Sequence, residues 1–163
     1  MILEELSYQE YELMNQISQL TNQKDSIELK IKELKIPESY IEIHKKYSNS
    51  DYEGLKRAIF LQWYAVIELM CNTGIGTIDS EEEKRNMLKL NNLVLEGKLD
   101  KEFQTMISYY YSIANWYFES FNGIDILLNY LKSNNESEQQ FRNLNIMTNR
   151  GQMGEYWNSI KKE

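Results

Sequence analysis

The stretch LKRAIFLQWYAVIELMC, residues Leu55–Cys71, decides the fold of this chain. Thirteen of its seventeen residues are apolar or aromatic, and none is Pro or Gly. The run is too long for a buried strand, because strands usually span about five or six residues. Charges near both ends and apolar residues between them are typical of a helix that other helices cover on most sides. We therefore predict a central helix over this stretch.

The composition of the rest of the chain predicts an all-α fold. Its 163 residues include only one Pro and seven Gly, so turn signals are sparse. A chain of this length can bury a core without disulfides or metals. We predict a single-domain bundle of six to seven helices, with a long heptad-patterned, coiled-coil-like helix over residues 1–35. Residues 38–132 would form the bundle core, and residues 133–163 would form a C-terminal segment that docks on the body.

Residues 1–35 carry the clearest periodic pattern. Apolar residues recur at alternating spacings of three and four, and the charged residues Glu10 and Lys24 fill the two gaps. A seam kept in register over nearly five heptads is typical of a coiled coil. The candidate dimer-interface residues on this seam are Leu6, Leu13, Ile17, Leu20, Ile27 and Ile31.

The charges along this helix favour an antiparallel mate. Four Glu and no basic residue precede Lys24, whereas the segment from Lys24 to Lys35 contains four Lys, both end residues included. Antiparallel packing would place Glu10 beside Lys24 of the mate, while parallel packing would bury like charges against each other. The sequence leaves open whether the mate is a second copy, in a homodimer, or another helix of the same chain.

Capping and helix-breaking residues predict the other boundaries. Pro37 starts a new helix, Ser80 and Glu83 form a capping box, and Asp100 caps the helix that follows. Gly97 ends one helix, and Asn122-Gly123 ends another. The predicted elements are helices over about 38–47, 80–96, 101–121, 124–132 and 138–148, a hinge at Gly151–Gly154, and a last apolar face at Met153, Tyr156, Trp157 and Ile160.

Catalytic and metal sites find little support in the sequence. His44 is the only His and Cys71 the only Cys, so paired Glu-x-x-His motifs or a Cys/His zinc set are not available. We expect His44 to be a partly exposed helix residue and Cys71 to be buried and therefore a poor nucleophile. Gly74-Ile75-Gly76 lacks the further residues of a phosphate loop. We predict no catalytic residues, no metal and no cofactor.

Arg57, Tyr64 and Glu68 form the best candidate binding stripe. Tyr64 and Glu68 each lie within about 20° of Arg57 around the predicted central helix. One interpretation is a small-ligand pocket with Glu68 as a carboxylate and Arg57 as a charge clamp. The other is a structural edge, in which these side chains meet water or neighbouring helices.

The net charge of −7 disfavours nucleic-acid binding, which depends on Lys and Arg at phosphates. No apolar run approaches the roughly 20 residues of a membrane span. Twelve Tyr and three Trp are many for this length, and such aromatic residues concentrate at interaction surfaces. The aromatic cluster over residues 109–118, at helical spacing, is more typical of a core than of a contact surface. We predict a cytoplasmic protein-binding module, of the inhibitor or immunity-protein kind, whose partner is another and possibly basic protein. The alternatives are a homodimeric scaffold through residues 1–35 and, less favoured, an enzymatic or ligand-binding pocket at Arg57, Tyr64 and Glu68.

Overall fold

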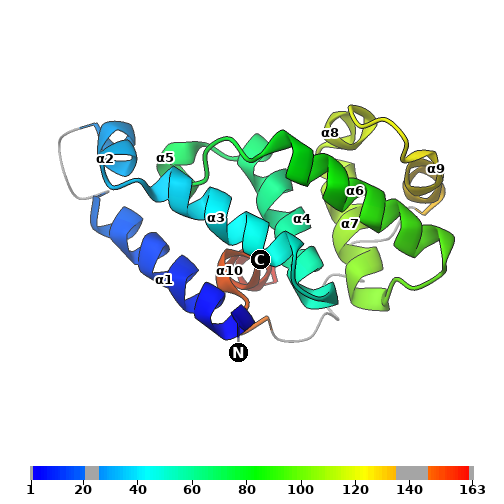
Figure 1. Cartoon of the computed structure of the whole chain (residues 1–163), viewed down its shortest axis with the longest axis horizontal. Helices are drawn as coiled ribbons and strands as arrows, with labels where there is room; N and C mark the ends of the chain where they lie inside the picture. The colour runs from blue at the N-terminus through cyan, green and yellow to red at the C-terminus, as the bar shows by residue number, and fades with distance from the viewer. Residues whose placement is uncertain (1, 21–25, 135–146, 162–163) are drawn as a thin grey trace. The chain divides into compact units, whose positions relative to one another are not determined.

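The protein is all-α, as the sequence predicted. The computed structural model describes residues 2–20, 26–134 and 147–161, which contain helices and no strand (Figure 1). The helices are α1 (Ile2–Leu20), α2 (Ile27–Glu33), α3 (Ile36–Ser48), α4 (Tyr52–Ile67), α5 (Met70–Thr73), α6 (Ser80–Leu95), α7 (Lys101–Ile113), α8 (Asn115–Glu119), α9 (Asp125–Ser133) and α10 (Gly151–Ile160).

The chain divides into two compact units, and the prediction of a single domain stays a prediction. The first comprises Met1–Glu82 together with Met147–Glu163, and the second is Glu83–Ile146. The first unit is therefore discontinuous in sequence, and its C-terminal helix α10 packs against α1 and α4. Helix α6 begins in the first unit and continues into the second.

The central helix of the first unit is confirmed as a buried element. Every residue from Gly54 to Trp63 of α4 is buried, including Lys56, Arg57 and Gln62. Asp51 caps its first turn by accepting a hydrogen bond from the Gly54 N–H at 3.0 Å. The helix ends at Ile67, four residues before the predicted end, because Glu68 and Leu69 adopt extended backbone conformations.

The N-terminal seam packs inside the chain. Leu6, Leu13, Ile17 and Leu20 are buried on α1, which contacts α3, α5 and α10. Ile31 on α2 is also fully buried, whereas Ile27 is half-buried. The mate left open by the sequence is thus a set of helices of the same chain, and pairing with a second copy stays a prediction.

The helix predicted over 1–35 does not run unbroken. Ser26 has a non-helical backbone and accepts a hydrogen bond from the Leu29 N–H, so α2 starts afresh at Ile27. Residues 21–25, including Lys24, lie outside the described residues. The bundle therefore has shorter pieces than the heptad pattern alone indicates.

The second unit builds its core on α7. Phe103, Met106, Ile107 and Tyr110 are buried on this helix, and Asn91 of α6 accepts a hydrogen bond from the Leu127 N–H at the start of α9. Asp100 caps α7 and Gly97 ends the preceding helix with a positive φ, as predicted.

Three predicted boundaries in the rest of the chain were wrong. The helix expected over 101–121 is interrupted at Ala114, whose φ of −140° and ψ of 60° separate α7 from α8. Asp79, rather than Ser80, caps α6 by accepting the N–H groups of Glu81 and Glu82. The expected hinge at Gly151–Gly154 is instead the first turn of α10. Residues 138–146 of the weak helix predicted over 138–148 lie outside the described residues, and Met147 and Thr148 are not helical.

Candidate functional site

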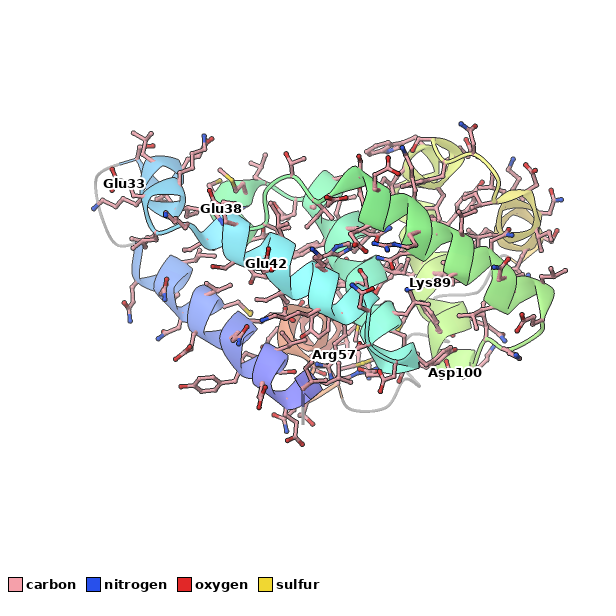
Figure 2. The ribbon with its side chains drawn as sticks, in the orientation of Figure 1. Glu33, Glu38, Glu42, Arg57, Lys89 and Asp100 are labelled. Atoms are coloured by element: carbon pink, nitrogen blue, oxygen red, sulfur yellow. The ribbon has the colours of Figure 1, made fainter. Side chains whose placement is uncertain are left out.

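Arg57, Tyr64 and Glu68 of the predicted stripe make different contacts, and their use as one binding pocket stays a prediction. Arg57 is buried, with its guanidinium turned toward the N-terminal turns of α1 (Figure 2). Tyr64 is half-buried in an aromatic cluster with Phe60 and Tyr156. Glu68 ends α4 and accepts a hydrogen bond from the Asn72 side chain at 2.8 Å. The three side chains thus serve three different local structures.

The expected environments of His44 and Cys71 were both wrong. His44 is only 1% exposed, and its Nε2 lies 3.1 Å from Oε1 of Gln62 on the neighbouring helix α4. Burial lowers the pKa of the His44 imidazole. Cys71 is half-exposed on the short helix α5, because the central helix ends before it.

Arg57 organises a buried polar cluster between α1, α4 and the start of α10. Its guanidinium donates to the Leu3 carbonyl, to Oγ of Ser7 at 2.6 Å and to the Asn149 carbonyl at 3.5 Å. Its Nε donates to Oε1 of Glu53 at 3.0 Å. One planar cation thus joins segments that lie up to 92 residues apart in sequence.

Glu53 connects the polar cluster around Arg57 to the C-terminal part of the chain. Its two carboxylate oxygens accept hydrogen bonds from Nε and Nη2 of Arg150, at 2.7 and 2.6 Å. A two-point pair of this kind fixes orientation as well as distance. Arg150 is the residue that precedes α10, so this ion pair positions the helix start.

Glu10 is the second charged group in this interior. Glu10 is 1% exposed, and its carboxylate accepts a hydrogen bond of 2.5 Å from the Tyr47 hydroxyl on α3. The other oxygen accepts the Gln152 N–H at 2.8 Å. Gly151, with φ +59°, leaves room for this approach, because a Cβ there would overlap the carboxylate. The backbone of α10 is therefore shaped around the Glu10 side chain.

The burial of Glu10 shifts its ionisation strongly. Desolvation raises the pKa of the Glu10 carboxyl to about 7, although the hydrogen bonds from Tyr47 and Gln152 and the charge of Arg57 oppose the shift. Burial and the neighbouring Glu10 also raise the pKa values of Tyr47 and Tyr40. The Tyr40 hydroxyl is buried without a hydrogen-bond partner among the described residues.

Sequence reasoning found Glu10 only as a gap in the heptad pattern. The expected partner was Lys24 of an antiparallel mate, whereas the observed partners are Tyr47 and the Gln152 backbone. A charged residue at an otherwise apolar seam position was the available signal. Its partners could not be identified because they lie 37 and 142 residues away.

The outer face of α1 is the most distinctive exposed surface of the first unit. Tyr8 is 63% exposed, and the surrounding residues Glu4, Glu5, Gln9 and Glu12 line an open depression of about 500 Å³ with it. A hydrogen bond to Glu12 raises the pKa of the Tyr8 phenol. Helix α1 carries no Lys or Arg, so this face presents an aromatic ring among negative charges only.

Metal and membrane sites were also sought in the described parts of the chain. There, no group of three or more His, Cys, Asp or Glu side chains is arranged to hold a metal ion. No helix in these parts combines the length and the apolar character of a membrane span. Comparisons of the chain with protein-family models, curated proteins and solved structures found no match.

Proposed function

We propose that this protein is a non-catalytic binding module that engages a basic partner protein through the outer face of α1. The specific form that we propose is an inhibitor or immunity-type protein that neutralises its partner in the cytoplasm. The observation that carries the proposal is Tyr8, a tyrosine 63% exposed to solvent among Glu4, Glu5 and Glu12.

The chemistry of this face suits a partner segment rich in Lys or Arg. Exposed tyrosines supply a large contact area at a small entropic cost, and they are frequent among the residues that dominate binding energy. A surface with charges of one sign accelerates association with the opposite sign and rejects like-charged proteins. The inner face of α1 is already used in the core, so the outer face is available without unfolding the helix.

The test uses two variants with the same change in charge. Glu4, Glu5 and Glu12 are changed to Gln in the first, and Glu33, Glu38 and Glu42 on α2 and α3 in the control (Figure 2). Each variant shifts the net charge of −7 by +3. A third variant, Tyr8→Ala, removes the aromatic ring alone.

Wild-type protein is used for affinity capture from the native cell, and the recovered partner is then measured against every variant by calorimetry. We expect a basic partner, at least about tenfold weaker binding for the α1 variant and for Tyr8→Ala, and near-wild-type binding for the control. Binding by the wild type should weaken steeply with salt. Equal losses in both charge variants, unchanged binding by the α1 variant, or an acidic partner would contradict the proposal.

A further inference from the structure

Within the first unit, the residues at the start of α10 form hydrogen bonds with α1 and α4. Asn149 offers its carbonyl to Oγ of Ser7 at 2.9 Å and to Arg57. Arg150 pairs with Glu53, and the Gln152 N–H binds the Glu10 carboxylate. These hydrogen bonds from residues 149–152 thus end on α1 or α4.

Glu10 has a special position in this cluster, because among the described residues it receives two donors and no direct ion pair. The Tyr47 hydroxyl and the Gln152 N–H reach its two oxygens, while Arg57 acts on it from a distance through its charge. Removing α10 would take away one of the two donors and expose the carboxyl group to water. The ionisation of Glu10 is therefore coupled to the docking of α10.

The charged and titratable groups around Glu10 come from each neighbouring element. Helix α3 contributes Tyr40 and Tyr47, whose pKa values are raised. Helix α4 contributes Arg57, whose pKa is lowered by burial but raised overall by its hydrogen bonds with Tyr47 and Glu53. The other titratable groups are Tyr11 on α1 itself, Arg150 before α10 and Glu155 on α10. Helix α5 presents the uncharged Asn72 and Thr73 beside Gln152, and Glu28 and Lys32 on α2 form an exposed pair.

We propose that the protonation state of the Glu10 carboxyl group controls the docking of α10. Helix α10 is docked while Glu10 carries its proton, and its docking weakens when Glu10 ionises. We call this arrangement the clasp. This inference does not depend on the proposed function, because Glu10 lies on the inner face of α1 and Tyr8 on the outer face.

Linkage gives the expected size of the effect. Burial raises the pKa of Glu10 to about 7 in the closed state, and the ordinary value of 4.5 is the limit that full exposure to water would give in the open state. At a pH between these two values, opening releases one proton from Glu10. The opening equilibrium of α10 should therefore rise by up to roughly 30-fold between pH 5.5 and pH 8.5.

The first experiment is hydrogen exchange of the full chain, followed in peptides that cover 147–161 and corrected for the intrinsic pH dependence of exchange. Wild type and the control Glu155→Gln should show this rise, whereas Glu10→Gln should show less than about a threefold change. Peptides from α3 and α4 should stay protected throughout. The same pH dependence in Glu10→Gln, or equal opening of α3 and α4, would overturn the clasp.

A second measurement needs no variant and keeps the proposal testable if Glu10→Gln does not fold. Carbon NMR of the side-chain carboxyl groups in the wild type reports the titration of Glu10 directly. A midpoint near 7, shared with the amide shifts of Gln152 and its neighbours, would support the clasp. A midpoint below 5 would refute it.

Discussion

The hydroxyl of Tyr47 donates a hydrogen bond of 2.5 Å to the buried carboxylate of Glu10, across 37 residues of sequence. This contact joins α1 to α3 at a position where a heptad seam would ordinarily carry an apolar side chain. A buried carboxylate is tolerated only when donors surround it. The Gln152 N–H supplies a second donor from α10, so three helices meet at one buried carboxyl group.

The first prediction concerns global stability and Glu10. Because the folded protein binds the Glu10 proton more tightly than the unfolded chain, this contribution is full below about pH 4.5 and is lost as the pH rises through 7. Between pH 4.5 and pH 8.5 the wild type should lose about 3 kcal/mol of unfolding free energy relative to Glu10→Gln. Urea denaturation of the first unit at both pH values measures the difference. A constant difference would contradict the raised pKa.

His44 should change the pH dependence of stability in the opposite direction from Glu10. Burial lowers its folded pKa, so its contribution is present above the unfolded value near 6.5 and is lost as the pH falls below it. We expect His44→Gln, made in the Glu10→Gln background, to remove the loss of stability between pH 7.5 and pH 5. Denaturation in urea across this range tests it, and an unchanged acid loss in the double variant would refute the assignment to His44.

Arg57→Leu should destabilise the first unit by about 3–5 kcal/mol, because it removes the cation and leaves buried acceptors without a donor. Lys32→Leu is the matched control, since Lys32 forms an exposed pair with Glu28 at 2.9 Å. The control should change the free energy of unfolding by no more than about 0.5 kcal/mol. Chemical denaturation of both variants gives the comparison, and similar small losses would show that the cluster contributes little.

Alanine substitutions at two glycines distinguish the cost of backbone strain from the cost of side-chain overlap. Gly97 and Gly151 both have positive φ, of 65° and 59°, but a Cβ at Gly97 meets nothing within 4 Å, whereas one at Gly151 overlaps the Glu10 carboxylate. Gly97→Ala should cost about 1 kcal/mol for the left-handed conformation alone. Gly151→Ala should cost at least about 1 kcal/mol more. Hydrogen exchange around each site measures the two losses, and equal values would argue against the overlap.

Burial along helices was the part of the fold that the sequence predicted best. The seam residues Leu6, Leu13, Ile17 and Leu20 and the central run around Phe60 are buried, because apolar periodicity records which face of a helix meets the core. Capping by Asp100 was also predicted, since a cap depends on residues within one turn.

Interruptions and long-range partners were not predictable in the same way. The chain leaves the helical conformation at Glu68 and at Ala114 without a Pro or Gly, because tertiary packing overrides local preference there. The stripe of Arg57, Tyr64 and Glu68 was predicted for an unbroken helix. Because α4 ends at Ile67, Glu68 does not continue the helical face that this prediction assumed. The Glu10 site needs residues 149–152, which no local pattern connects to α1.

The discontinuity of the first unit has a consequence for synthesis on the ribosome. Residues 1–82 emerge first, but Glu10 and Glu53 gain their contacts with Gln152 and Arg150 only after residues 83–146 have been translated. At about 5–20 residues per second, these 64 residues correspond to a delay of several seconds. During that interval the nascent N-terminal helices hold an incomplete core, and the intervening segment Glu83–Ile146 has time to fold before the first unit closes.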